Sequence, residues 1–209
     1  LVGSEMCIRD RIRTVRSRGI FMEHAAPEGS GAMSAVLGMD AEVIEDVLNG
    51  REGVSIANYN CPGQIVITGE AAAVAEAGTA LKEAGARRVL PLKVSGPFHS
   101  PMMRPAGEEL AKVFAGVSMN PLKIPYVANI NAEVITDCGR IEGLLVEQVS
   151  GSVRWQQSVE TMIREGVDTF VEIGPGKTLT GFLRKIDKNV KAYHIGSWEE
   201  AVQVCEELK

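Results

Sequence analysis

The sequence predicts a mixed α/β fold, in which a compact unit of four strands and two helices precedes a stretch of alternating helices and strands. Two observations support this prediction. Residues 30–94 contain short apolar runs separated by turn residues and by two stretches with helical spacing. After residue 95, helical stripes alternate with apolar runs, a pattern typical of a layered and mostly parallel sheet. At 209 residues, the chain can hold one domain that carries a smaller one.

The first unit is predicted over residues 30–94 with the element order βαββαβ. Its strands are expected at 33–37, 54–58, 64–68 and 89–94. A short helix is expected between Asp40 as N-cap and Gly50 as stop, and a second one over 71–84. The segment 60–63, Asn-Cys-Pro-Gly, is predicted to turn the chain between the second and third strands. Pro91 places the last strand at a sheet edge, because proline cannot donate to a neighbouring strand on both sides. This order is the ferredoxin-like arrangement.

The second unit is predicted over residues 95–209. Its helices are expected at 101–117, 141–149, 158–165, 178–186 and 198–208, and its strands at 124–128, 169–173 and 192–195, the strand 169–173 being buried. These strands are too few for a complete sheet. We therefore expect the small unit to be inserted in a larger α/β domain whose first half is missing, with residues 14–29 as a remnant. Residues 1–13 fit poorly and are interpreted as a non-native, linker-derived segment.

Composition excludes several functional classes. A formal net charge of −5 and the lack of a basic patch mixed with aromatic residues argue against nucleic-acid binding. No apolar run approaches the roughly 20 residues that span a bilayer. The four cysteines are scattered and have no zinc-ligand spacing, so we predict reduced thiols in a cytoplasmic protein and no metal site.

His99 is the first candidate for chemistry, because it stands between a predicted strand and a predicted helix. Ser100 could serve as N-cap and Pro101 as first helical residue, which would place His99 at the positive end of that helix. This dipole would lower the pKa of the imidazole and keep it neutral near pH 7, as a general base requires. The alternative is a histidine that only orders a loop.

Three other patterns are judged to be structural. The segment 174–178, Gly-Pro-Gly-Lys-Thr, lacks the glycine spacing of a phosphate loop and is predicted to be a tight turn between strand and helix. The segment 53–57 resembles a G-x-S-x-G nucleophile elbow, but it lacks the final glycine and its serine lies inside a strand. Cys61 has no neighbour that would lower the pKa of its thiol and is interpreted as a structural residue.

Two interpretations, ligand binding or an ordinary structural position, remain for Asn58, Asn60 and Arg18. Alternation along the backbone puts both asparagines on one side, where their amides could bind a polar ligand, yet asparagine is also an ordinary turn residue. Arg18 would be a surface residue of a helix unless a carboxylate is presented to its guanidinium.

Taken in order, several motifs resemble the malonyl-CoA:acyl carrier protein transacylases and the related acyltransferase domains of polyketide synthases. They cover the chain from about Thr14 to its C-terminus, and they are Arg18-Gly19-Ile20-Phe21-Met22, Gly31-Ala32-Met33, Asn58-Tyr59-Asn60-Cys61-Pro62-Gly63-Gln64, Gly96-Pro97-Phe98-His99, Val153-Arg154-Trp155 and Glu172-Ile173-Gly174-Pro175-Gly176-Lys177. The resemblance implies a ferredoxin-like subdomain within an α/β-hydrolase-like domain. In this family the nucleophilic serine lies in a G-H-S-x-G elbow upstream of the arginine, and this sequence contains no such elbow.

The resemblance also implies a role for each matching residue. His99 matches the histidine that activates the serine and later the incoming thiol. Arg18 matches the arginine that pairs with the free carboxylate of malonate. Phe98 matches a position associated with malonyl selection, although it could simply pack. Asn58 and Asn60 match residues that line the acyl or CoA channel. A backbone carbonyl orients the histidine in relatives, and the residue at that position here is Arg154.

These implications lead to an expected function. The parent enzyme would move a malonyl group from malonyl-CoA to the phosphopantetheine thiol of acyl carrier protein by a ping-pong mechanism, without metal or redox cofactor. The chain itself would be an N-terminally truncated, inactive fragment. The alternative is a non-enzymatic module whose ferredoxin-like unit binds a ligand or a partner.

Overall fold

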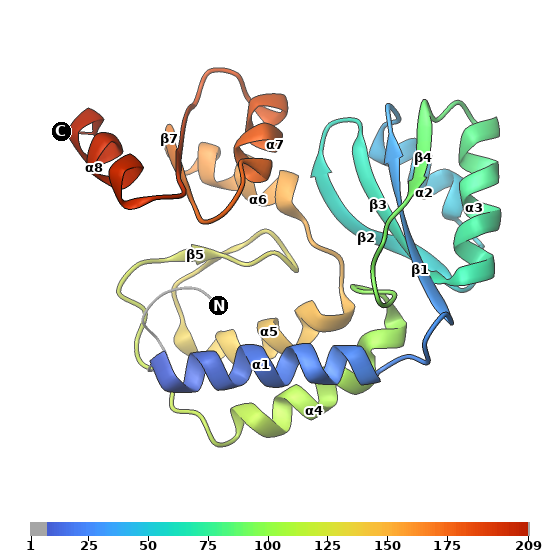
Figure 1. Ribbon diagram of the computed structural model, residues 1–209, viewed down its shortest axis with the longest axis horizontal. Coiled ribbons are helices and arrows are strands. Elements are labelled where there is room, and N and C mark those ends of the chain that lie inside the picture. The colour runs from blue at the N-terminus through green and yellow to red at the C-terminus, as the bar shows by residue number, and fades with distance from the viewer. Residues whose placement is uncertain (1–7, 209) are drawn as a thin grey trace.

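The computed structural model describes residues 8–208, which form a four-stranded sheet, a layer of helices and a two-stranded parallel sheet near the C-terminus. Figure 1 shows the four-stranded sheet on the right, the parallel strands with their helices at the upper left, and the helical layer below both. The molecule therefore has an α/β fold, as the sequence predicts.

The larger sheet is antiparallel, with the strand order β2-β3-β1-β4. Its elements are β1 (Gly31–Leu37), α2 (Ala41–Leu48), β2 (Val54–Cys61), β3 (Gln64–Glu70), α3 (Ala71–Glu83) and β4 (Arg88–Pro91). The predicted βαββαβ order is thus present. β4 lies at an edge, which agrees with the argument from Pro91.

β2 differs from its prediction, because it continues past Asn58 to Cys61. The turn to β3 is therefore made by Pro62 and Gly63 alone, and Gly63 takes the positive φ of 72° that favours glycine. Pairing with β3 extends as far as Cys61, which lies opposite Gln64. The register shifts once between Ile56 and Asn58 and again between Tyr59 and Cys61. The backbone bonds to β3 outweigh the preference of asparagine for turns.

The two faces of the sheet pack against different layers. One face joins α2 and α3 in a sheet core, whose most buried members are Val36, Ile44, Ile65, Ile67, Val74, Ala77 and Leu81. The other face presents Met33, Ala35, Ala57 and Val66, and Phe98 packs against them. Because side chains alternate along a strand, Ala35 and Val36 point to opposite layers.

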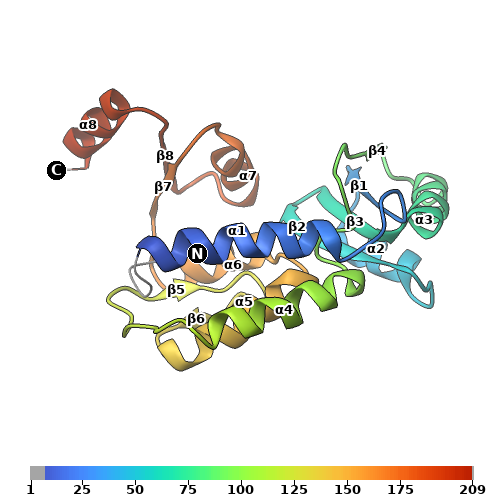
Figure 2. The ribbon, with the colours of Figure 1, turned by 60° about the horizontal axis from the view of Figure 1, so that its bottom comes forward.

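Three helices form the second layer: α1 (Ile8–His24), α4 (Arg104–Phe114) and α5 (Ile141–Ser150). Figures 1 and 2 both show α4 running beside α1, with α5 next to it. A short 3-10 helix, η1 (Pro101–Met103), leads into α4. The buried members of the helical core between these helices are Met22, Met103, Ala106, Leu110, Phe114 and Val149.

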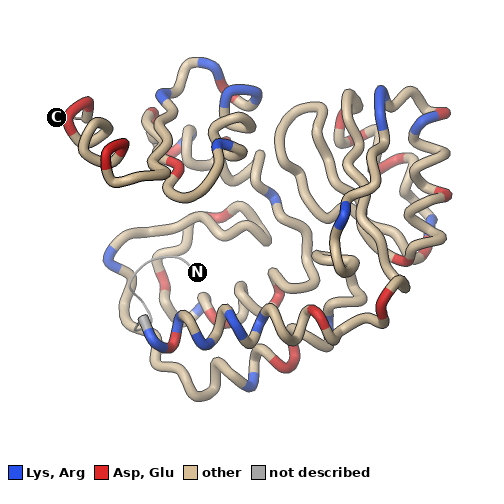
Figure 3. The backbone as a smooth tube through the Cα atoms, in the orientation of Figure 1, with Lys and Arg blue, Asp and Glu red and all other residues tan. Residues whose placement is uncertain are grey.

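α1 runs without interruption from Ile8 to His24 and carries a row of basic residues, as Figure 3 shows. Residues 8–13, which were expected to belong to a non-native segment, are the first turns of this helix. The remainder of that expected segment, residues 1–7, lies outside the described residues.

The C-terminal region starts with two short strands, continues to a parallel pair and ends with a helix. The elements are β5 (Tyr126–Val127), β6 (Val134–Ile135), η2 (Cys138–Arg140), α6 (Trp155–Arg164), β7 (Thr169–Ile173), α7 (Thr178–Ile186), β8 (Lys191–Ile195) and α8 (Trp198–Glu207). β6 had no counterpart in the sequence analysis. The parallel sheet contains β7 and β8 alone among the described strands.

The prediction that β7 is buried is wrong. Ile173 is 78% exposed and Val171 is 36% exposed, because only β8 pairs with β7 within residues 8–208.

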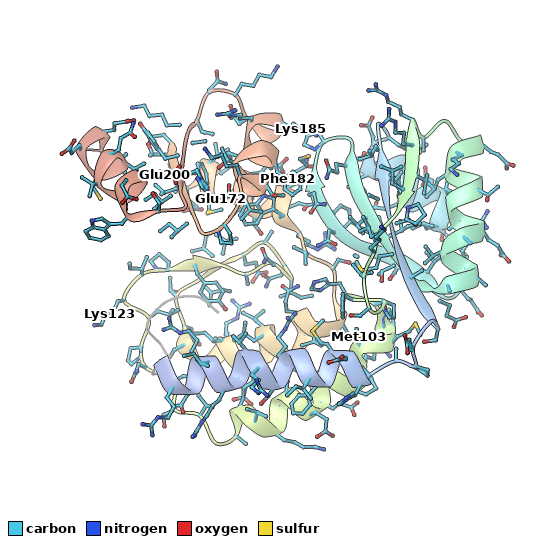
Figure 4. All side chains as sticks on the ribbon, in the orientation of Figure 1. Met103, Lys123, Glu172, Phe182, Lys185 and Glu200 are labelled. Carbon is cyan, nitrogen blue, oxygen red and sulfur yellow. The ribbon has the colours of Figure 1, made fainter. Side chains whose placement is uncertain are left out.

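In Figure 4, Lys185 of α7 lies towards the turn between β2 and β3, where its Nζ donates to Gln64 Oε1 at 3.3 Å. Across residues 8–208, no helix is both long enough and apolar enough to cross a membrane.

Phe114 provides a test of the helical core. It is 1% exposed between helices that also carry Arg18 and the carbonyl partners of His99, so Phe114→Ala should lower the free energy of unfolding by about 3–5 kcal/mol. Val43→Ala on α2, at a position 41% exposed, should change it by less than about 1 kcal/mol. Urea unfolding of both variants measures the difference, and equal effects would contradict this account of the core.

Candidate active site

His99 lies in a tightly constrained loop between β4 and η1. Its φ is +59°, a left-handed conformation that is uncommon for residues other than glycine. Ser100, the next residue, is fully buried, and its hydroxyl donates to the Pro97 carbonyl at 2.7 Å. As predicted, Ser100 holds the N-cap position and Pro101 the first helical position, although the helix that begins here is the 3-10 helix η1 and the Ser100 hydroxyl makes no capping bond. His99 therefore directly precedes a helix start, in a loop that the bond of Ser100 to Pro97 holds.

The imidazole of His99 is oriented by two main-chain carbonyls. Nδ1 lies 3.0 Å from the Gln148 oxygen and 3.2 Å from the Gly151 oxygen. A carbonyl oxygen only accepts hydrogen bonds, so Nδ1 must carry the proton and donate it. Nε2 then keeps its lone pair, which is the state that a general base needs.

The pKa of His99 is lowered from its usual value, first of all by burial, which disfavours the charged imidazolium. The bond to Gln148 acts in the opposite direction, the positive charge of Arg18 lowers the pKa further, and the bond to Gly151 raises it. The predicted lowering of the pKa is therefore present, but its largest cause is burial rather than the helix that starts after Ser100. The C-terminus of α5 lies nearby as well, and its last carbonyls favour a positive charge.

Arg154 does not supply the orienting carbonyl, so this expectation is corrected. The Arg154 oxygen accepts bonds from the backbone N–H and the hydroxyl of Ser158 in the first turn of α6. Its guanidinium lies 5.4 Å from the centre of the Tyr59 ring, a cation–π contact. The carbonyls that do hold His99 belong to Gln148 and Gly151, at the end of α5. Only a sequence argument that paired the loop with a helix end some 50 residues away could have found them.

Arg18 lies on α1, one turn after Thr14, and both line a pocket of about 300 Å³. Gln148, Asn129 and Tyr126 line the same pocket from other elements. Burial lowers the pKa of the Arg18 guanidinium. The structure thus brings Arg18 into the electrostatic range of His99, although the two lie 81 residues apart in the sequence.

Two further polar groups belong to residues that line this pocket. The Thr14 hydroxyl and the Gln148 side-chain nitrogen are buried and have no hydrogen-bond partner among the residues that the structure describes. Buried donors without partners are costly, so these two are unusual in a folded chain. The sequence analysis did not identify Thr14 or the Gln148 side chain, because neither belongs to a motif.

Phe98 packs against both layers of the molecule. Its ring contacts the sheet residues Met33, Ala35, Ala57 and Val66, and it also packs against the helical core. Its expected part in malonyl selection stays a prediction, while its packing role follows from these contacts.

Asn58 and Asn60 lie in β2 and not in a turn, which corrects that part of the prediction. Both are partly buried, and Asn58 forms a parallel bridge with Val153. This bridge connects β2 to the segment that leaves α5, whose residue Gly151 contacts His99. Their expected contact with an acyl or CoA channel stays a prediction.

The segment 174–178 is a turn between β7 and α7, where a carboxylate already occupies the helix N-terminus. Glu172, labelled in Figure 4, accepts from the N–H groups of Leu179 and Thr180 and from the Thr180 hydroxyl, at 2.6 to 3.1 Å. A phosphate would have to displace this acidic side chain. The site therefore does not have the form of a phosphate loop.

Comparison with known proteins places this geometry in a family. The family model of the acyl transferase domain matches residues 3–204. The malonyl CoA-acyl carrier protein transacylase of Bacillus subtilis (strain 168) is 43% identical over an alignment that covers 100% of this chain and 67% of the relative. The chain belongs to the malonyl CoA-acyl carrier protein transacylases. It spans 67% of the length of this relative and 58% of the length of the Escherichia coli (strain K12) transacylase.

Solved structures of other transacylases share the fold. The enzyme from Clostridium perfringens ATCC 13124 is 39% identical with a TM-score of 0.93, covering 98% of this chain and 65% of that one. A malonyl-transacylase in complex with a type II PKS acyl-carrier protein is 38% identical with a TM-score of 0.91, covering 97% and 67%.

The interpretation of the chain as an N-terminally truncated fragment is overturned. The family model of the acyl transferase domain matches from residue 3, and the Bacillus subtilis relative aligns over the whole chain. The interpretation of residues 1–13 as a non-native segment stays a prediction.

Burial of His99 predicts how stability depends on pH. Its pKa is lower in the folded chain than the usual 6.5, so between these two values the unfolded chain binds more protons. The free energy of unfolding should therefore rise with pH across this interval and fall on acidification. His99→Gln should remove this contribution, as measured by urea unfolding at a series of pH values. An unchanged profile in the variant would contradict the assignment.

Arg18→Gln should raise the pKa of His99, because a nearby positive charge is removed. NMR titration of the His99 ring protons measures this shift. Arg16→Gln, at an exposed position on the same helix, is the matched control and should leave the titration of His99 unchanged. Equal shifts in both variants would argue against proximity of Arg18 to His99.

Proposed function

We propose that this chain carries the acid–base and carboxylate-binding residues for transfer of a malonyl group from malonyl-CoA to the phosphopantetheine thiol of acyl carrier protein. The observation that carries the proposal is His99, whose Nδ1–H is held by two carbonyls so that Nε2 is free to accept a proton. The transacylase family supports the choice of reaction.

His99 would act in both halves of a ping-pong reaction. Nε2 takes the proton of a seryl hydroxyl as its oxygen attacks the malonyl thioester, and the imidazolium returns that proton to the departing CoA sulfur. In the second half, Nε2 takes the proton of the phosphopantetheine thiol, the sulfur attacks the malonyl ester, and the serine oxygen regains a proton. The sequence has no G-x-S-x-G elbow, so no residue of this chain is assigned as the nucleophile.

Protein groups stabilise the imidazolium and the substrate in separate ways. The main-chain carbonyls of Gln148 and Gly151, at the end of α5, accept the Nδ1–H of His99. These hydrogen bonds become stronger when the ring becomes positive. Arg18 would pair with the free carboxylate of malonyl, assisted by the Thr14 hydroxyl and the Gln148 amide in the same pocket. An acetyl group would leave the guanidinium and these donors without partners, which disfavours acetyl-CoA.

The same proposal includes the organisation of the protein and its surroundings. Residues 30–94 would be a ferredoxin-like subdomain, and residues 14–29 and 95–209 would belong to an α/β-hydrolase-like subdomain. Phe98 would contribute to malonyl selection, and Asn58 and Asn60 would line the acyl or CoA channel. Within residues 8–208, Cys61, Cys138 and Cys205 form no disulfide, which supports a location in the reducing cytoplasm.

Binding to the chain tests the carboxylate site directly. Calorimetry should show that malonyl-CoA binds more tightly than acetyl-CoA, and Arg18→Met should weaken malonyl-CoA binding by about ten- to a hundredfold, as expected for a lost charge-assisted pair. Arg16→Met on the exposed face of α1 is the control and should bind like the unaltered chain. Equal affinities for the two thioesters would contradict the proposal and favour a non-enzymatic module.

Turnover tests the role of His99. The chain can be joined to the elbow-bearing segment of a family member, and malonyl transfer from malonyl-CoA to acyl carrier protein then followed by mass spectrometry. In this chimera, His99→Ala should lower the rate by about 10²- to 10⁴-fold, the usual contribution of a general base. His24→Ala, at an exposed position on α1, is the control. A full rate without His99 would exclude it as the base.

A further inference from the structure

The linker between α5 and α6 runs along the free edge of β2. Val153 N donates to the Ala57 carbonyl at 2.7 Å, and Tyr59 N donates to the Val153 carbonyl at 2.8 Å. Between these two strand residues, Asn58 forms the parallel bridge to Val153. A short piece of linker therefore extends the four-stranded sheet by a bridge on its β2 side.

Ser152 adds a side-chain bond to this contact. Its hydroxyl donates to the Ile56 carbonyl at 2.6 Å, from a partly buried position. The partners on β2 are all main-chain groups, namely the carbonyls of Ile56 and Ala57 and the N–H of Tyr59. The linker is therefore held to the strand at three points. Residues 56 and 152 lie 96 positions apart, so this bond connects the two layers of the molecule.

The same linker also holds His99. Gly151, which precedes Ser152, accepts from the imidazole Nδ1–H at 3.2 Å and ends α5 by donating to the Glu147 carbonyl at 2.9 Å. A side chain at this position would collide with Ile130, so the backbone here is enclosed on that side too. Gly151 is thus fixed by α5 on one side and by the bond of Ser152 to β2 on the other.

We propose that Ser152 is a positioning residue for His99, acting through the Gly151 carbonyl that it keeps in place against β2. Two acceptors at Nδ1 fix both the tautomer and the plane of the ring. If the Ser152 hydroxyl no longer holds the linker, the Gly151 oxygen can move away from Nδ1. The Gln148 carbonyl is then the one remaining acceptor of the two. The ring can then rotate, and more of it adopts the Nε2-protonated tautomer, which cannot accept a proton at the reacting nitrogen.

This connection makes the β2 edge part of the support for the histidine. The groups on β2 that face a substrate channel in our proposed function lie on the same strand, so a displacement of β2 is transmitted to Gly151. The significance for catalysis rests on the proposed function, but the mechanical link between Ser152 and His99 does not. The experiment therefore reads the imidazole itself and needs no substrate.

The test uses the full chain with ¹⁵N- and ¹³C-labelled histidine. In the unaltered chain, the ring ¹⁵N shifts should report protonated Nδ1 and unprotonated Nε2 at a pH where the imidazole is neutral. Ser152→Ala should change the tautomer ratio by about two- to tenfold towards protonated Nε2, the range expected when one hydrogen bond is lost. It should also lower the pKa of His99, because the Gly151 bond raises it.

Ser158→Ala is a matched control. The Ser158 hydroxyl also donates to a main-chain oxygen, that of Arg154 at 2.8 Å, in the helix that follows the same linker, but it has no connection to Gly151. Ser152→Thr keeps the hydroxyl and should restore the ratio of the unaltered chain. The amide shift of Val153 reports whether the linker has left β2 in each variant.

The outcomes separate the alternatives. A tautomer change in Ser152→Ala that is absent in Ser158→Ala and reversed in Ser152→Thr supports the positioning role. Unchanged ring shifts in a folded Ser152→Ala chain would overturn it, whether or not the Val153 amide has moved, as would equal changes in both alanine variants. If Ser152→Ala does not fold, Ser152→Cys, with its weak donor, takes its place under the same criteria. Failure of malonyl-CoA binding would leave this result intact and would bear on the proposed function alone.

Discussion

Phe98 joins the two apolar layers of this protein, and the position of the candidate active site depends on that shared contact. Its ring packs on the sheet through Met33, Ala35, Ala57 and Val66, and on the helical core through the opposite side. The backbone of the next residue, His99, has a φ of +59°. The Ser100 hydroxyl holds the loop by donating to the Pro97 carbonyl. A loop held at both layers can keep an unfavourable conformation that an isolated turn would relax.

Burial and charge then set the chemistry of the imidazole. Removing His99 from water lowers its pKa, Arg18 lowers it further, and the carbonyls at the end of α5 oppose both effects. The ring is therefore neutral at rest and yet has two acceptors ready for the positive charge that develops when Nε2 takes a proton. Arg18 itself lines a pocket together with Thr14 and Gln148, whose buried polar atoms have no partner within residues 8–208.

The linker between α5 and α6 connects these features across the molecule. It follows the helix that provides the Gln148 carbonyl, provides the Gly151 carbonyl itself, extends the sheet beside Asn58 and places Arg154 over Tyr59. The transacylase family shares this overall fold at about 40% sequence identity. Ser152 lies outside the recognised motifs, and its hydroxyl bonds this linker to the Ile56 carbonyl of β2.

The sequence by itself determined the local elements and the identities of the candidate site residues. The βαββαβ order and the bounds of α7 followed from apolar periodicity and turn residues, which depend on neighbours a few positions apart. The family motifs pointed to His99 and Arg18, because a short motif specifies which residue types stand at neighbouring positions. The tertiary structure decided what lies far apart in the sequence: that β2 continues to Cys61 by pairing with β3, that β7 is exposed, and that the partners of His99 are the carbonyls of Gln148 and Gly151. Main-chain carbonyls are the same for every residue type, so no pattern of side chains could single out the two that hold the imidazole.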